Sequence, residues 1–316
     1  MLDCLCTGIL VADHLCTPIP RFPNAGELIL AEGLPLTIGG CAANAAVDLA
    51  RLGVRVGVVG CVGADPFGQF IVDSLRGHGI ETEGIRTLEG VGTSGTLIIN
   101  VQGQDRRFIH ALGANGRFRV SDIPIEQALA AKVLYVGGYL LMSNFEQDAL
   151  LDLFRACRGK RVKTVLDVVL PGPGDHWKRL ERVLAETDVF LPNVDEAAAI
   201  TGLADPLRQA ERFVAAGAKA AVITCGEQGT VLVSQDLRVH AGVYPVSFVG
   251  GTGAGDAFDA GYIAGLLAGE DAIGCLKWGS ALGASCVRAI SATESVFSRD
   301  EAIRFMQSHE LPLERL

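Results

Sequence analysis

This sequence lacks the features of a membrane, secreted or nucleic-acid-binding protein. No apolar stretch reaches the roughly 18 uninterrupted residues of a membrane-spanning helix, although the mean hydropathy is +0.33. The basic segment that opens a signal peptide is missing, and Asp3 and Asp13 lie in that region instead. Long basic runs are also missing, and 27 Lys and Arg residues against 36 Asp and Glu residues give a net charge of −9. We therefore expect a cytoplasmic protein that binds neither membranes nor nucleic acid.

The cysteines do not form the pattern of a disulfide framework or a metal site. There are nine of them, and the close pair Cys4 and Cys6 lies at alternate positions of an apolar run rather than at metal-ligand spacing. We expect small buried side chains there. The 316 residues are 49% hydrophobic and 20% charged, which suffices for a deep core and excludes a disordered chain.

Short apolar runs alternate with helical patterns along most of the chain. The β-rich runs are at residues 54–59, 132–136, 162–166, 189–191 and 220–224. Helical patterns include 41–52, which is rich in Ala, and 144–157, which has an apolar stripe. This alternation is typical of βαβ units on a parallel sheet with both faces covered. We predict a single large α/β domain over residues 1–316.

Two segments, approximately 15–37 and 93–111, interrupt this alternation. In the second, residues 96–101 and 106–111 alternate apolar and polar side chains around the turn-like residues Gln102-Gly103-Gln104-Asp105. We predict that these segments add antiparallel strands and form a small β lid, discontinuous in sequence, over a ligand site. So small a sheet has no core of its own, so its second face needs the main domain or a second subunit.

A glycine-rich turn enters a predicted helix at residues 250–258 (GGTGAGDAF). Gly253, Ala254 and Gly255 allow backbone N–H groups to converge at a helix N-terminus, which favours binding of a phosphate. Asp256 would follow in the first helical turn, where it can accept a proton from a hydroxyl group held next to that phosphate. This pattern indicates phosphoryl transfer. The alternative is a glycine-rich helix start in which Asp256 is only an acid that the helix dipole favours.

Two other nucleotide-binding motifs do not fit. The third glycine of a dinucleotide-binding fingerprint would fall at Asp256, and no such fingerprint follows the first apolar strand. A Walker A loop needs Gly-Lys followed by Ser or Thr, and no such triplet occurs.

Polar residues and glycines at other strand ends extend the candidate site. Gly39 and Gly40 precede the Ala-rich helix and permit close backbone approach to a ligand, and Asn44 offers a donor and an acceptor to hydroxyl groups. Asp13 follows the first apolar strand, at the edge where parallel sheets bind ligands. The alternatives are a glycine-capped packing helix with a solvated Asn44, and an Asp13 that only caps a turn.

Each of two further motifs can be explained either by ligand binding or by local structure alone. Asn193 and Glu196 follow the run 189–191 and can hold Mg²⁺ through water, or form an ordinary helix cap. Thr224, Gly226 and Gly229 follow the run 220–224, where a hairpin with two glycines is a sufficient explanation.

From about residue 8 to residue 293, these motifs resemble, in order, those of the ribokinase-like, or PfkB-type, carbohydrate kinases. Residues 252–258 match the second half of the family signature Asp-Thr-Thr/Asn-Gly-Ala-Gly-Asp-x-Phe, and residues 39–53 match its N-terminal signature. The resemblance implies a three-layer αβα sandwich with a mostly parallel sheet and a small β lid. Gly250 and Gly251 depart from the signature, whose Asp helps to hold a monovalent cation in several members, so potassium activation is doubtful.

The resemblance also implies a role for each candidate residue. Asp256 is the catalytic base, Gly253, Ala254 and Gly255 form the anion hole, and Asp13, Gly39, Gly40 and Asn44 bind the sugar. Asn193, Thr224, Gly226 and Gly229 contact ATP, and Glu196 with Asn193 organises Mg²⁺.

We therefore expect an ATP-dependent kinase that phosphorylates a hydroxyl group of a small sugar or sugar acid. A nucleoside kinase on the same scaffold is the alternative. A non-catalytic sugar-binding pseudokinase is a third, against which the presence of Asp256 argues. Many family members dimerise through the lid, so a homodimer is expected. The acceptor is not encoded in these motifs, because its contacts come mainly from the variable lid.

Overall fold

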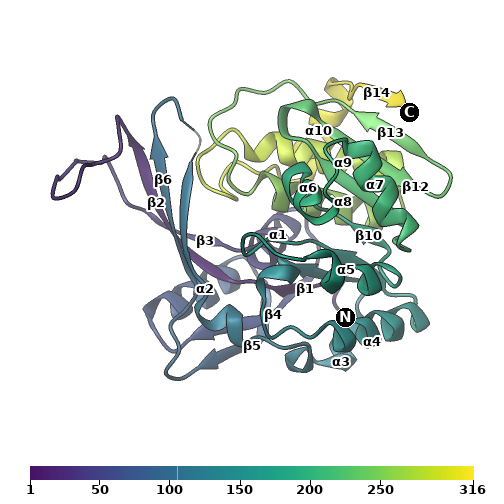
Figure 1. Ribbon diagram of the computed structural model, residues 1–316, viewed down its shortest axis with the longest axis horizontal. Coiled ribbons are helices and arrows are strands. Elements are labelled where there is room, and N and C mark those ends of the chain that lie inside the picture. The colour runs from purple at the N-terminus through teal and green to yellow at the C-terminus, as the bar shows by residue number, and fades with distance from the viewer. Residues whose placement is uncertain (105) are drawn as a thin grey trace.

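The computed structural model describes residues 1–104 and 106–316. Asp105, the last residue of the predicted lid turn, lies outside this description. The described residues form one large sheet covered by helices and a smaller sheet that stands apart from it (Figure 1).

The large sheet has ten strands among the described residues, in the order β14-β13-β12-β11-β10-β9-β8-β1-β4-β5. Neighbouring strands from β11 to β5 run parallel, and β12, β13 and β14 extend one edge in antiparallel pairs. The strand bounds are β1 Cys4–Gly8, β4 Val56–Gly63, β5 Glu81–Leu88, β8 Val133–Gly137, β9 Lys163–Leu166, β10 Val189–Phe190, β11 Ala220–Thr224, β12 Thr230–Ser234, β13 Arg238–Ala241 and β14 Leu313–Arg315. The predicted mostly parallel sheet is confirmed.

Helices cover both faces of this sheet, with one apolar core on each side. One core contains buried residues of the helices α1 Cys41–Arg51, α2 Pro66–Gly77, α8 Ala254–Ala268, α9 Ala272–Cys286 and α10 Arg299–Ser308. The other core contains buried residues of the helices α3 Ile125–Ala130, α4 Gln147–Gly159, α5 Trp177–Leu184, α6 Val194–Thr201 and α7 Pro206–Ala215. Short 3₁₀ helices are η1 Gly113–Arg117, η2 Val120–Asp122, η3 Tyr139–Leu141 and η4 Gly226–Gln228. Among these described helices none is both long enough and apolar enough to cross a membrane.

The side chains of β1 show how the strands serve both cores. Cys4 and Cys6 contribute to one core and Leu5 to the other, as alternation along a strand requires. All nine cysteines are free thiols, and Cys225 alone among them is not fully buried. The prediction that Cys4 and Cys6 are small buried side chains is therefore confirmed.

The predicted elements and the observed ones differ mainly at their ends. The strand predicted at 54–59 runs from Val56 to Gly63, and the helix predicted at 144–157 begins only at Gln147. Its N-cap, Glu146, has an extended backbone with ψ 131°, so the helix cannot start earlier.

The small sheet has the order β3-β2-β6-β7, with β2 Val11–Ile19, β3 Leu36–Gly39, β6 Gly95–Val101 and β7 Arg107–Ala111. Each pair β2/β3 and β6/β7 is antiparallel, as predicted, but β2 and β6 join the two pairs in parallel. We call these four strands, the loop at residues 20–35 and the described residues that connect β6 to β7 the lid. The lid begins earlier than predicted, since only two residues separate β1 from β2. Asp13 consequently lies within β2, and its predicted place at the end of the first strand is wrong.

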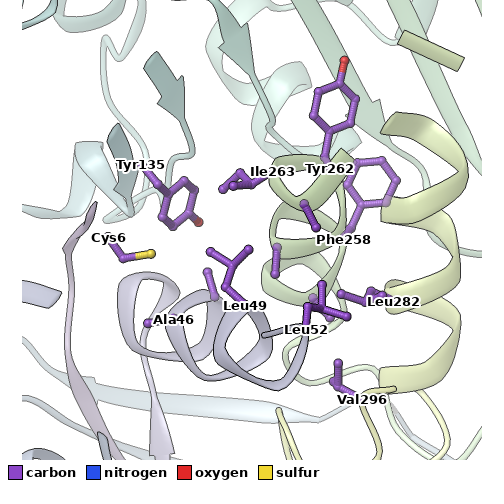
Figure 2. Packing of buried hydrophobic residues seen from close by; sticks show 14 of the residues in the cluster. Cys6, Ala46, Leu49, Leu52, Tyr135, Phe258, Tyr262, Ile263, Leu282 and Val296 are labelled. Atoms are coloured by element: carbon purple, nitrogen blue, oxygen red, sulfur yellow. The ribbon is translucent and has the colours of Figure 1, made fainter. Parts of the chain in front are cut away.

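Small and apolar residues hold α1 against α8, which packs in turn against α9 (Figure 2). Leu49 of α1 and Leu52, directly after the helix, lie on the side of α1 that faces Phe258 and Leu282, and all four side chains are buried. This packing brings the first turns of α1 and α8 together at the carboxyl edge of the sheet, where parallel α/β proteins bind ligands.

Candidate active site

The glycine-rich turn ends in a left-handed residue that caps α8. Gly253 is the N-cap, with φ 79°, and a Cβ atom there would lie 2.5 Å from the Cβ of Ala292. Gly255 differs, because a Cβ atom on it would meet no atom within 4 Å. The first turn of this 15-residue helix therefore faces open space through Gly255. The positive end of the helix dipole makes that space favourable for an anion.

The backbone of Ala254 is partly occupied within the turn itself. Its N–H group donates to the carbonyl oxygen of Gly251 at 3.3 Å. Of the three residues predicted for the anion hole, Gly255 thus has the most open surroundings, while Gly253 is required by the backbone geometry.

Asp256 and Asn44 are in direct contact across the α1–α8 interface. Asn44 Nδ2 donates to Asp256 Oδ2 at 2.8 Å. Burial raises the pKa of Asp256, while hydrogen bonds from Asn44 and Cys41 oppose that rise. A carboxylate with a raised pKa is a better proton acceptor near neutral pH than an ordinary aspartate.

Asp13 faces the same region from β2. Its side chain is buried, and burial raises its pKa to about 6, with a further contribution from the negative charge of Asp256 and an opposing hydrogen bond from Thr96. A Cβ atom on Gly39 would lie 2.0 Å from Asp13 Oδ2, so Gly39 leaves room for this carboxylate.

Gly40 serves the fold as the N-cap of α1. It has φ 89°, and a Cβ atom there would lie 2.5 Å from the carbonyl oxygen of Ile9. The glycine-capped helix considered from the sequence is therefore present. Asn44, in contrast, is not solvated: it is buried, and its Oδ1 atom has no hydrogen-bond partner among the described residues.

Cys41, Asp167 and Asp259, which we did not single out from the sequence, also belong to this cluster. The ligand atoms of Cys41, Asp167 and Asp256 all lie within 4.8 Å of one another. Asp167 Oδ2 accepts from the N–H group of Gly138 at 3.0 Å. Asp259 Oδ2 accepts from the hydroxyl of Tyr135 at 2.8 Å, and Figure 2 shows this hydroxyl pointing toward the side of α8.

A signal for Asp167 was present in the sequence, because it directly follows β9 as an acid at a strand end. Asp259 lies one helical turn after Asp256 and could have been found by helical spacing. No sequence pattern indicated a role for Cys41.

The acidic side chains of this cluster repel one another. Burial raises the pKa values of Asp167, Glu196 and Asp259, and each is raised further by the charge of Asp256. Carboxylate oxygens are the ligands that Mg²⁺ prefers, and a divalent cation would relieve this repulsion. The donor set thus fits a magnesium ion.

Asn193 and Glu196 form the helix cap that the sequence left open as an alternative. Asn193 Oδ1 accepts from the Glu196 N–H group at 2.9 Å, and Glu196 Oε2 accepts from the Asn193 N–H group at 3.0 Å. The cap and a role in metal binding are compatible, because the charge of Glu196 reaches Asp167.

The segment around Thr224 lies next to this cap. Asn193 and Thr224 form a parallel bridge, so both side chains are at the same sheet edge. Gly226 and Gly229 have φ values of 57° and 86° in the β11–β12 hairpin, and a Cβ atom on Gly229 would lie 2.0 Å from the carbonyl oxygen of Ala241. The hairpin alone therefore requires Gly229.

Comparison with known proteins agrees with this geometry. The model of the pfkB family carbohydrate kinases matches residues 1–298. The ribokinase of Haemophilus influenzae is 27% identical over 307 residues, which cover 95% of this chain and 97% of that protein. The 5-dehydro-2-deoxygluconokinase of Clostridium perfringens is 27% identical over 274 residues, covering 82% of this chain and 80% of that protein.

A solved structure shows the same fold. A putative ribokinase II of E. coli, crystallised with ATP and Mg²⁺, superimposes with a TM-score of 0.84 at 24% identity and covers 98% of this chain and 100% of that chain. The chain belongs to the pfkB family of carbohydrate kinases, which are phosphotransferases acting on sugar hydroxyl groups.

Proposed function

We propose that this protein transfers the γ-phosphate of ATP to a hydroxyl group of a small sugar or sugar acid. The observation that carries the proposal is the contact between Asn44 and Asp256 beside the open first turn of α8. It supports the proposal because the proposed proton acceptor, the proposed hydroxyl-binding amide and the proposed anion site would lie within one small region.

The acceptor hydroxyl would lie between Asp13, Asn44 and Asp256. Asp13 and the Asn44 Oδ1 atom, which has no partner within the described part of the chain, would accept hydrogen bonds from sugar hydroxyl groups. Asp256 would take the proton of the reacting hydroxyl as its oxygen attacks the γ-phosphorus. The bond between that phosphorus and the β,γ-bridging oxygen breaks, and its electron pair leaves with ADP.

The donor would lie along the carboxyl edge of the sheet. Backbone N–H groups at the start of α8, most openly at Gly255, would bind the transferring phosphoryl group. Thr224, Asn193 and the glycines of the β11–β12 hairpin would line the nucleotide. The ATP and Mg²⁺ bound in the E. coli neighbour support this choice of donor.

Glu196 with Asn193, and the nearby carboxylates, would hold Mg²⁺, which when bound neutralises phosphate charge. Gly250 and Gly251 contribute no side-chain ligand for a monovalent cation. We therefore propose that the activity does not depend on potassium.

We further propose a homodimer formed through the lid. Leu97 of β6 pairs with Ile109 of β7, and their side chains are 39% and 60% exposed. Apolar side chains on the outer face of so small a sheet favour a partner surface.

The test starts from a panel of sugars, sugar acids and nucleosides assayed for ADP release. Asp256→Asn is expected to lower kcat by about 10² or more while ATP binding persists. Turnover like that of the wild type in this variant would refute the role of Asp256. A preference for nucleosides in the panel would select the nucleoside kinase, and thermal shifts with acceptor but no phosphorylation of any acceptor would select the pseudokinase.

A further inference from the structure

We propose that Arg106 is carried by the lid to the phosphoryl-transfer centre, where its guanidinium group contacts the phosphoryl group during transfer. This inference rests on the proposed kinase function. Arg106 directly precedes β7, so it belongs to the hairpin between β6 and β7. Figure 1 shows this part of the lid beside the loops that flank α8 and α9.

The guanidinium group of Arg106 lies close to Gly251 in the turn before α8. A Cβ atom on Gly251 would lie 2.9 Å from Arg106 Nη1 and 3.6 Å from both Cζ and Nη2. Any side chain at position 251 would therefore press on the guanidinium group. Gly251 is only two residues before Gly253, the N-cap of α8. The lid thus brings a cation to the entrance of the proposed anion site.

A contact of Cys286 with the turn before α8 also supports this position of Arg106. Cys286 Sγ donates to the carbonyl oxygen of Thr252 at 3.3 Å, so this thiol lies directly against the same turn. The positive charge of Arg106 lowers the pKa of Cys286, against the stronger effects of burial and of Asp48 and Asp256. The charge of Arg106 therefore acts on the thiol that contacts this turn.

The chemistry of the site calls for a cation at this place. Several carboxylates, among them Asp13, Asp167 and Asp259, are gathered around Asp256, and ATP adds further negative charge. Arginine is always charged and presents five N–H donors that match phosphate oxygens. An arginine supplied to a phosphoryl group in this way accelerates transfer by about 10³–10⁵ in other enzymes. Because Arg106 is part of the lid, lid closure over the acceptor would also complete the catalytic site.

Arg107 provides a matched control in the adjacent position. Its Nη2 atom donates to Gln104 Oε1 at 2.6 Å, and its guanidinium group lies 6.0 Å from the ring centre of Phe22 in the lid. Both contacts are within the lid. Arg107→Ala removes the same charge from the same hairpin but not from the turn before α8.

The kinetic test compares Arg106→Ala, Arg106→Lys and Gly251→Ala with Arg107→Ala, using the acceptor found in the panel above. Arg106→Ala should lower kcat by about 10² or more, with KM of the acceptor within about threefold of wild type. The lysine variant should recover part of the rate, and added guanidinium should partly restore the alanine variant. Gly251→Ala should lower kcat, and Arg107→Ala should leave it within about twofold.

An effect confined to the acceptor KM, or equal losses in Arg106→Ala and Arg107→Ala, would overturn the proposal.

A binding test does not depend on the acceptor. Calorimetry measures the affinity for ADP alone and for ADP with aluminium fluoride, which mimics the transferring phosphoryl group. Arg106→Ala should lose affinity for the fluoride complex by about tenfold or more, with ADP affinity and the melting temperature unchanged. Equal affinity of this variant and the wild type for the fluoride complex would overturn the role of Arg106. A wild type that binds no ADP would instead contradict the proposed kinase function.

Discussion

Asn44 and Asp256 are 212 positions apart in the sequence, yet the Asn44 amide donates to the Asp256 carboxylate at 2.8 Å. Each lies in the first turn of its helix, so the contact depends on how α1 packs against α8. The core on this side of the sheet contains many Ala residues of both helices beside Leu49 and Phe258, and such small side chains allow the two helices to approach closely. A change in this packing would therefore move the proposed base relative to the proposed sugar site.

The two glycines at the start of α8 should respond differently to substitution. Gly255→Val adds a side chain in open space, so we expect a stable protein whose transfer rate falls by about tenfold or more because phosphate is excluded. Gly253→Ala has to adopt φ 79° and collides with Ala292, so it should lower the free energy of unfolding by about 1–3 kcal/mol. Urea unfolding and kinase assays measure both effects. Normal activity of Gly255→Val would place the anion site elsewhere.

Asp13 should control the acceptor rather than ATP. We expect Asp13→Ala to raise the acceptor KM by about tenfold or more and the ATP KM by less than about twofold. The pKa of Asp13 is raised to about 6, so its ionised form, the stronger acceptor of hydroxyl hydrogen bonds, becomes populated as pH rises through about 6. Acceptor affinity should increase from pH 5 to 7 in the wild type and change less in Asp13→Asn. Equal pH profiles would contradict this role.

Glu196 offers a way to separate its capping role from its metal role. Glu196→Gln keeps a side chain that can complete the cap with Asn193 but removes the negative charge. We expect the Mg²⁺ concentration for half-maximal activity to rise in this variant while the melting temperature changes little. Glu196→Ala should raise that concentration and also cost about 0.5–2 kcal/mol of stability through the lost cap. An unchanged magnesium titration in Glu196→Gln would leave only the capping role.

Asp48 should make the fold less stable as pH rises. It is fully buried, and neither carboxylate oxygen has a hydrogen-bond partner among the described residues. Burial raises its pKa well above the ordinary value, Asp256 raises it further and Arg51 opposes the rise. The native state therefore binds this proton more tightly than the unfolded chain, so its stabilising effect is lost as pH rises through the native pKa.

The matched variant is Asp48→Asn, which is neutral at every pH. Between the ordinary pKa of the unfolded chain and the raised native pKa of Asp48, the free energy of unfolding of the wild type should fall relative to the variant by up to about 1.4 kcal/mol per pH unit, and above the native pKa the difference should stay constant. Urea unfolding at a series of pH values from about 5 upward measures the difference. Parallel curves for the two proteins would show that Asp48 does not titrate in this way.

Dimer formation should depend on the outer face of the lid. Light scattering at micromolar concentration is expected to give about twice the monomer mass of 33.2 kDa. Ile109→Asp, on the 60% exposed side chain in β7, should give monomers. Leu313→Asp, on β14 at the far edge of the large sheet, is the control and should remain dimeric. A monomeric wild type would contradict the dimer and leave the kinase proposal unaffected.

The order of elements and the position of the glycine-rich turn were predictable because they depend on local sequence. The run at 220–224 became β11 with the predicted bounds, since its apolar, β-branched residues end at a glycine hairpin. Asp256 was placed in a first helical turn for the same kind of reason, as Gly253 adopts the left-handed backbone that starts α8.

The sequence by itself thus determined the α/β class, the helix start at Asp256 and the existence of a lid, because periodicity and glycine chemistry act over a few residues. Only the tertiary structure decided that β2 and β6 pair in parallel and that Cys41, Asp167 and Asp259 join Asp256. It also decided that Arg106 reaches Gly251. These relationships join segments far apart in the chain, and the packing of helices and sheets sets them rather than any local pattern.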